Sequence, residues 1–326
     1  MPAGSLSPRP LGSSGMDVSA LSLGSWRTFE RLPAADGTAI LRAARDEGIT
    51  FFDDARYNDE TGQAPIPTGY SEVLFGELFR AAGLRRDDTV VANKLWWEFW
   101  PDQSAAAELD ASLRRMKFDY VDLIYALPPP AGLAVADLVA ATAGLVTVGK
   151  ARAWALVNWP ARQCAEAVRA AAGLGAAPPC AVQLPYSLVR RDWAEDPVMT
   201  EALTAAGAGV IASFCLAGGV LSGKYRPGTA TGRQAGSLAD PQLAPALRAA
   251  DELAGLAAQL GTTPATLALL FPLTNPGVTS VLFGATSARQ VRENCAVTGL
   301  RDRLGAGDLA RLRRIGQASG TGTGPG

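Results

Sequence analysis

DYVDLIYALPPP, residues 119–130, contains a short run, VDLIY (121–125), that is typical of a buried β-strand. Strands of a parallel sheet are covered on both faces, so they are almost continuously apolar instead of alternating. Seven further runs share this character: LSLG (21–24), TFFDD (50–54), TVVANK (89–94), RAWALV (152–157), AVQL (181–184), GVIASF (209–214) and TSVLF (279–283). The sequence therefore predicts eight parallel strands.

Amphipathic stretches separate these strands, and several of them end on a glycine, as helices commonly do. Thr263 followed by Pro264 forms a typical helix start. Strands that alternate with helices in this way predict an α/β fold, the (β/α)8 TIM barrel, with long loops at the carboxyl ends of its strands. A doubly wound sheet is the alternative, but similar units without a break in composition favour a closed barrel.

The chain contains no convincing linker, so we expect a single (β/α)8 domain over residues 1–326, with flexible tails at 1–10 and 316–326. Polar loops rich in Pro or Gly follow the second and seventh strands, at residues 58–69 and 226–243. Both loops would lie at the carboxyl ends of the strands, where barrel enzymes build their active sites.

Composition argues against several classes of function. The 326 residues include 30 basic and 31 acidic side chains, which leaves no electrostatic footprint for nucleic acid. No apolar run reaches the roughly 18 residues needed to cross a membrane, and no signal peptide opens the chain, so we expect a cytoplasmic protein. With no histidine and four scattered cysteines, no metal site is expected. These cysteines are expected to be small buried residues, with a reactive thiol at Cys215 as the alternative.

The strand ends carry the side chains that could do chemistry. Asp53 and Tyr57 follow the second strand, Lys94 ends the third, and the fourth ends in Leu127 and three prolines. An ammonium group favours the phenolate form, and a carboxylate can orient that ammonium, which makes a phenol with a pKa of about 10 usable in proton transfer. Taken alone, the aspartate is more typical of a loop cap and the lysine of a solvated side chain, but together these residues predict a proton-transfer site.

A second group of residues is suited to a phosphate-rich ligand. Gly218–Lys224 fits the spacing G-x-x-x-x-G-K, but Tyr225 follows where a P-loop needs Ser or Thr, so we do not expect a P-loop. The glycine-rich turn with Lys224 and Arg233 still suits phosphate, as does the helix start at Thr286.

The order of these motifs resembles the aldo-keto reductases over about residues 11–295. The matching stretches are LGSSGMDVSALSLGSW, GITFFDDARY, GYSEVLFGELFR, VVANK, LVTVGKARAWALVNW, QLPYSLVRR, LAGGVLSGKY and SVLFGATSARQVREN. LGSWRTF, DYVDLIYAL and the last of these motifs are most similar to the branch of potassium-channel β-subunits.

The resemblance implies an oxidoreductase that binds NADPH. It implies that Asp53, Tyr57 and Lys94 are catalytic and that Trp26, Trp96, Trp97 and Leu127 surround the substrate. It also implies a set of residues that contact the cofactor: Ser25, Trp26, Asn158, Gln183, Tyr186, Phe214, Leu216, Ala217, Gly218, Lys224, Arg233, Thr286, Gln290, Glu293 and Asn294. Within this set, Asn158 and Gln183 would hold the carboxamide, Tyr186 would stack on the nicotinamide, and Glu293 with Asn294 would contact the adenine.

The sequence departs from the family pattern near the catalytic residues. Leu127 occupies the position of the family's histidine, and Tyr57 follows Asp53 by four residues instead of five. Asp54 replaces a small hydroxyl residue, Val157 replaces a serine, and Tyr70 is the alternative proton donor.

We expect reduction of an aldehyde, ketone or quinone with NADPH, because the sources of hydride and proton are both retained. Reduction of an activated C=C or C=N bond is one alternative, and a non-catalytic NADPH sensor or partner subunit is another. Leu127 and the prolines favour a bulky or conjugated small molecule. Five aromatic side chains either line the mouth of the site or pack between helix and loop: Trp26, Trp96, Trp97, Phe99 and Trp100. The sequence does not fix an oligomeric state.

Overall fold

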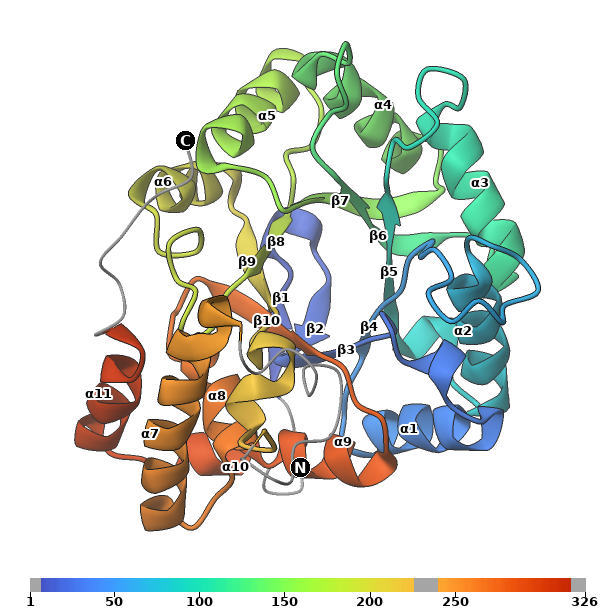
Figure 1. Ribbon diagram of the computed structural model, residues 1–326. Helices are drawn as coiled ribbons and strands as arrows, with labels where there is room; N and C mark the ends of the chain where they lie inside the picture. Colours follow the sequence, from blue (N-terminus) through green and yellow to red (C-terminus); the bar gives the residue numbers. More distant parts are fainter. Residues whose placement is uncertain (1–6, 226–239, 318–326) are drawn as a thin grey trace.

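Eight parallel strands form a closed barrel in the order β10-β3-β4-β5-β6-β7-β8-β9, with helices around it (Figure 1). The computed structural model describes residues 7–225 and 240–317. The barrel strands are β3 (Leu21–Gly24), β4 (Phe51–Asp53), β5 (Val90–Leu95), β6 (Val121–Ala126), β7 (Ala151–Val157), β8 (Ala181–Pro185), β9 (Gly209–Ser213) and β10 (Val278–Phe283). All eight predicted strands and the predicted (β/α)8 barrel are confirmed.

The helices lie outside the ring of strands and follow them in sequence. They are α1 (Ala34–Asp46), α2 (Tyr70–Ala81), α3 (Ala105–Met116), α4 (Val135–Thr147), α5 (Ala161–Gly173), α6 (Pro197–Ala206), α7 (Ala244–Leu260), α8 (Pro264–Leu273), α9 (Ala288–Cys295), α10 (Val297–Arg301) and α11 (Ala306–Arg314). Shorter 3-10 turns are η1 (Gly12–Ser14), η2 (Phe29–Arg31), η3 (Arg86–Asp88), η4 (Ala217–Ser222) and η6 (Pro241–Leu243). As the sequence predicts, Thr263 caps α8, because its side chain accepts a hydrogen bond from the amide of Thr266.

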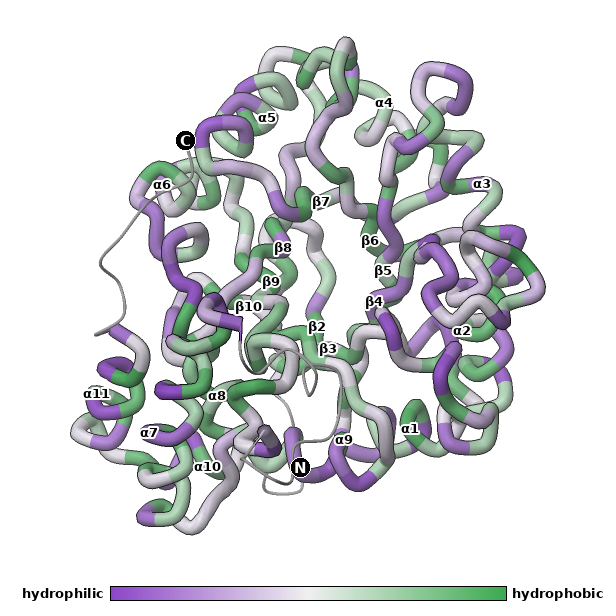
Figure 2. The backbone as a smooth tube through the Cα atoms, in the orientation of Figure 1, coloured by the Kyte–Doolittle hydropathy of each residue, from purple (hydrophilic) through white to green (hydrophobic). Residues whose placement is uncertain are grey.

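Apolar side chains fill two layers, one inside the barrel and one between the strands and the helices. On β6, for example, Leu123 and Tyr125 face the barrel interior, whereas Ile124 and Ala126 pack in the outer layer. This burial on both faces explains why the strands are mostly hydrophobic in Figure 2 while the helices carry hydrophilic residues as well. The barrel interior is therefore a packed core and not a channel.

A hairpin of β1 (Pro8–Pro10) and β2 (Asp17–Ser19) closes the amino-terminal end of the barrel. Leu11, Met16 and Val18 pack with the residues of the barrel interior. The turn needs glycine at position 12, where φ is +50° and a Cβ atom would lie 2.0 Å from the carbonyl oxygen of Cys180. Residues 8–10, which belong to the flexible tail expected over 1–10, instead form strand β1. Residues 1–6, and residues 318–326 of the tail expected at 316–326, lie outside the described part.

The loop at residues 58–69 contains no helix and only an isolated bridge between Asn58 and Thr68, as expected. Of the loop expected at 226–243, residues 226–239 lie outside the described part, and 241–243 form η6. Within the described residues, no single helix is both long and apolar enough to cross a membrane. Pro241–Leu260 and Pro264–Leu273 pass that test only as a pair joined by a bend of 97°.

Candidate active site

Asp53, Lys94 and Tyr57 meet at the carboxyl end of the barrel. Asp53 is the last residue of β4, and Lys94 lies near the end of the neighbouring strand β5. The Lys94 Nζ atom forms an ion pair with Asp53 Oδ1 and donates a hydrogen bond of 3.2 Å to the hydroxyl of Tyr57. Both charged side chains are buried. The structure therefore brings together the three side chains that the sequence singles out for proton transfer.

Gln183 extends this cluster from the opposite side of the barrel. Its amide Nε2 on β8 donates a hydrogen bond of 2.9 Å to Asp53 Oδ2. Each carboxylate oxygen of Asp53 thus has its own partner, which fixes the orientation of the carboxylate and, through it, of Lys94. Gln183 is therefore a hydrogen-bond partner of Asp53. It is also one of the residues that the resemblance implies for the contact with the nicotinamide carboxamide.

The surroundings of Tyr57 keep its phenol protonated. Burial raises the pKa of Tyr57 well above its ordinary value, and the nearby carboxylates of Asp53 and Asp54 add to the effect. Burial and these carboxylates outweigh the stabilisation of the phenolate that is expected from Lys94, whose ammonium is also paired with Asp53. A phenol with a raised pKa holds its proton at neutral pH, which is the state that a proton donor needs.

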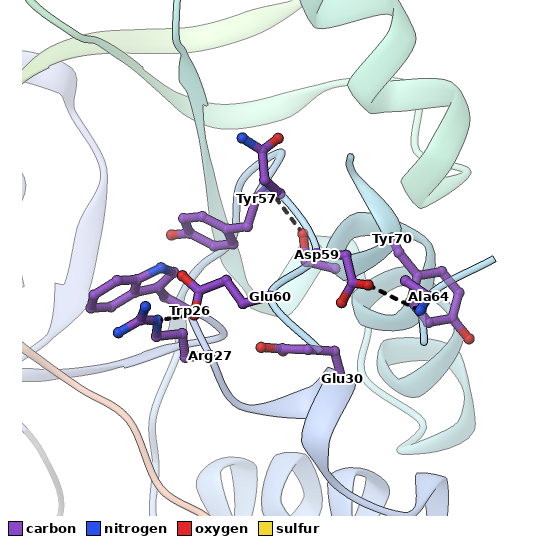
Figure 3. Close-up of a pocket in the computed structure, with 10 residues that line it drawn as sticks. Trp26, Arg27, Glu30, Tyr57, Asp59, Glu60, Ala64 and Tyr70 are labelled. Atoms are coloured by element: carbon purple, nitrogen blue, oxygen red, sulfur yellow. Dashed lines mark hydrogen bonds and ion pairs between the residues drawn. The ribbon is translucent and has the colours of Figure 1, made fainter. Parts of the chain in front are cut away.

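Two tryptophan side chains lie against the Tyr57 ring. Its centroid lies 6.4 Å from that of Trp26 and 5.9 Å from that of Trp96, and Phe214 in turn lies 5.5 Å from Trp26. Figure 3 shows the Tyr57 ring directed toward Trp26, whereas Tyr70 lies on the other side of the pocket with its hydroxyl pointing away. Of the two candidate phenols, Tyr57 is the one that contacts Lys94.

The loop at 58–69 forms the charged wall of this pocket. Glu60 forms ion pairs with Arg27 at 2.5 Å and with Arg31 at 3.1 Å, which connect the loop to the segment after β3. Asp59 accepts hydrogen bonds from Thr61 and Ala64, and the bonds from Thr61 lower the pKa of Asp59 to about 2. The loop therefore has a defined conformation even though it contains no regular element.

Arg56 holds together the two loops beside Tyr57. Its guanidinium is buried, donates hydrogen bonds of 2.8 Å to Thr68 and 2.6 Å to Glu98, and lies over the ring of Phe99. Sequence reasoning did not identify this residue, although a charged side chain directly before the tyrosine is a visible signal. Arg56 thus fixes the segment that carries the phenol.

Trp97 does not line the pocket. It is only 4% exposed, packs in the outer core layer and adopts a left-handed backbone conformation at φ 60°. Its amide and that of Trp96 donate hydrogen bonds to the buried carboxylate of Glu108, which fixes the backbone after β5. Of the two predicted tryptophans, Trp97 is thus buried in the core, whereas Trp96 lies against Tyr57.

Leu127 stands directly after β6, and its amide donates a hydrogen bond of 3.1 Å to the carbonyl of Leu95. Its side chain is half-buried against both core layers and has no group that can move a proton. Two residues earlier, Tyr125 is fully buried inside the barrel, with Lys94 Nζ 5.7 Å from its ring centroid. Its hydroxyl has no hydrogen-bond partner among the described residues and is closed off from solvent.

A second buried carboxyl group lies next to Asp53. Ser25 donates a hydrogen bond to Asp54, and burial, followed by repulsion from Glu72, raises the pKa of Asp54 well above its ordinary value. Glu72 itself is fully buried, pairs with Arg115 and accepts a hydrogen bond of 2.8 Å from Asn93. Ser25, predicted to contact the cofactor, thus has Asp54 as its partner.

The turn after β9 has the backbone shape of an anion-binding loop. Phe214, Ala217, Gly218, Gly219 and Gly223 all have positive φ values, and successive amides in such conformations form concave donor sites. Phe214 is 48% exposed and Leu216 is half-buried, while Cys215 is buried, and burial raises the pKa of its thiol. A reactive thiol is therefore not supported. Lys224 is exposed at the end of the turn, and Arg233 lies outside the described residues.

The start of α9 lies beside this turn, because β9 and β10 are paired. Thr286 donates from both its amide and its hydroxyl to the side-chain oxygen of Gln290, so these two predicted residues do meet. Glu293 is exposed and forms an ion pair of 3.0 Å with Arg289, whereas Asn294 is buried.

Two residues predicted to hold the nicotinamide differ in their surroundings. Asn158 follows β7, is exposed and has φ 58°, with its amide bonded to the carbonyl of Gln183 at 2.9 Å. Tyr186 is fully buried, packs against Phe271 and donates its hydroxyl to Glu195 at 2.6 Å. The stacking role predicted for Tyr186 does not fit this arrangement, because its ring has no exposed face.

Comparison with known proteins places this geometry in a family. The model of the aldo/keto reductase family matches residues 20–316. The chain belongs to the aldo/keto reductase family. It is 35% identical over 299 residues to a probable voltage-gated potassium channel subunit beta of Oryza sativa subsp. japonica, covering 87% of this chain and 88% of the relative. A protein of the same description from Arabidopsis thaliana is 34% identical over 302 residues, with the same coverage.

In this aldo/keto reductase, the elements after β9 and β10 fit the phosphates of a dinucleotide. The left-handed turn offers backbone amides, Lys224 offers an exposed ammonium, and the start of α9 offers a helix N-terminus with Thr286. Both elements lie on the same end of the barrel as Tyr57. The residues present are therefore compatible with a pyridine dinucleotide beside the phenol.

Proposed function

We propose that this aldo/keto reductase reduces a carbonyl group, in an aldehyde, ketone or quinone, with NADPH. The observation that carries this proposal is the contact of Lys94 with both Asp53 and the Tyr57 hydroxyl. Reduction adds a hydride to the carbonyl carbon and a proton to its oxygen. NADPH supplies the hydride when bound, and Tyr57 supplies the proton.

The chain's own residues handle that proton in two stages. Tyr57 gives up its proton, and the phenolate that forms lies beside the Lys94 ammonium, which stabilises the new negative charge. Asp53 and Gln183 hold Lys94 in place during this change. Because Tyr57 keeps partial contact with solvent, water can return the proton afterwards.

Leu127 makes the reaction slower than in a site with a polar residue at that position. One missing hydrogen bond to the carbonyl oxygen costs about 1–3 kcal/mol, which corresponds to roughly 10- to 100-fold in rate. The apolar side chain, together with Trp26 and Trp96, supports a bulky or conjugated substrate. Such a substrate activates its own carbonyl by delocalisation, so it depends less on an external donor.

Two alternatives follow from particular observations. The apolar wall at Leu127 also suits an activated C=C or C=N bond, which needs less polarisation of an oxygen. The relatives described as channel subunits support a non-catalytic role as an NADPH sensor or partner subunit. In each case we propose a small-molecule ligand, a location in the cytoplasm and no nucleic-acid partner.

NADPH oxidation with a panel of quinones, aldehydes, enones and imines tests these alternatives. The proposal predicts turnover of carbonyl substrates that is lost in Tyr57→Phe and retained in Tyr70→Phe. Turnover of enones or imines alone would favour the first alternative. Tight NADPH binding without turnover of any class would favour the second.

A further inference from the structure

The described part of the chain has an open depression at the end of the barrel opposite to Tyr57. Its volume is about 440 Å³, within the range of about 300–1,000 Å³ that is common for small-molecule sites. It includes Gly209 and Val278, the first residues of β9 and β10, and Arg9 and Pro10 of the β1–β2 hairpin. Tyr57 and Lys94 lie at the other ends of the strands, so the two sites are separate.

The charged side chains that line this depression are all positive. Arg9 and Arg301 line it from segments almost 300 residues apart, and no aspartate or glutamate is among its lining residues. Neither arginine forms an ion pair with any residue in the ranges 7–225 and 240–317. By contrast, Arg86 and Arg152 share the buried carboxylate of Asp122. Arg9 is half-buried and Arg301 is exposed.

The two guanidinium groups raise each other's electrostatic energy. Arg9 is half-buried and donates one hydrogen bond, of 2.9 Å, to the carbonyl of Val278. Burial lowers the pKa of Arg9, and the nearby charge of Arg301 adds to this effect. An anion between them would relieve both the repulsion and the loss of hydration. Each guanidinium carries five N–H donors, and Arg9 uses one of them here.

We propose that this depression is a second binding site, which takes the phosphate group of a small molecule through Arg9 and Arg301. Guanidinium groups bind phosphate through paired hydrogen bonds, and two of them can contact one phosphate from two sides. Gly12, Gly207 and Gly277 also line the depression, so no side chain projects into it from these positions. Nothing in this proposal depends on NADPH or on turnover.

Titration of the full chain with inorganic phosphate, followed through the backbone amide resonances, tests the proposal. We expect saturable shifts at Gly207, Gly209 and Gly277 that exceed those caused by sodium chloride or acetate at equal ionic strength. Arg301→Gln is the main variant, because its side chain makes no hydrogen bond within the described residues. It should weaken this response about tenfold or more, since one charged hydrogen bond contributes about 1.5–3 kcal/mol.

Arg9→Gln should weaken phosphate binding to a similar extent, with thermal melting as the check on the β1–β2 hairpin. Arg303→Gln is the matched control, because Arg303 is exposed nearby but does not line the depression. Shifts confined to residues 217–224 and 286–290 would show that phosphate binds only at the end of the barrel that carries Tyr57. That result, or an Arg301→Gln response equal to that of the control, would overturn the proposal.

Discussion

Replacing Lys94 by methionine removes the positive charge that contacts the Tyr57 hydroxyl, while it keeps most of the side-chain volume. At 3.2 Å, an ammonium and a phenolate attract each other by about 5 kcal/mol at an effective dielectric constant of about 20. The Asp53 carboxylate on the same ammonium cancels part of that attraction. We therefore expect the transition state to lose about 2–4 kcal/mol, or roughly 30- to 1,000-fold in kcat.

The Michaelis constant should change little, because Lys94 does not line the pocket beside Tyr57. Stability should change as well. Loss of one partner of a buried ion pair leaves Asp53 uncompensated and costs about 3–5 kcal/mol in the free energy of unfolding. Steady-state NADPH oxidation and urea unfolding measure the two effects separately.

The double variant Lys94→Met with Asp53→Asn is the matched control. It removes both charges, so it should recover much of the lost stability without recovering kcat. A kcat for Lys94→Met within about twofold of the parent would contradict the assigned role. So would recovery of activity in the double variant, because the defect would then be one of folding alone.

Three further results are expected. Tyr57→Phe should reduce kcat about 10²- to 10⁴-fold, and the parent rate should stay level up to high pH, because the phenol must be protonated and its pKa is raised; an unchanged rate in Tyr57→Phe would show another donor. Leu127→His should raise kcat for aldehydes by up to about 100-fold, provided that the imidazole reaches the carbonyl, and a matched Leu127→Phe should not; equal rates would mean that polarisation is not limiting. Asp54→Asn should become progressively more stable than the parent as pH rises from about 4 toward the raised pKa of Asp54, because the parent must take up a proton on folding in that window. Urea unfolding at about pH 5 and about pH 8 measures this; the same difference in the free energy of unfolding between variant and parent at both pH values would refute it.

The sequence by itself determined the barrel and the location of the chemistry. Each strand is covered on both faces, so it appears as a short apolar run, and all eight runs coincide with strands to within a residue or two. In a closed parallel barrel, the carboxyl ends of all strands meet at one end. For that reason, Asp53 and Lys94 could be placed together, with a nearby tyrosine, before any distance was known.

Only the tertiary structure decided how the side chains around that cluster are arranged. Loop paths that no local sequence pattern encodes decide three features of the site. These are the choice of Tyr57 over Tyr70, the core position of Trp97 and the burial of Tyr186. The raised pKa of Tyr57 depends on the sum of burial and several carboxylates. Such quantities are set by distances between residues far apart in the chain, and hydrophobic periodicity carries no information about them.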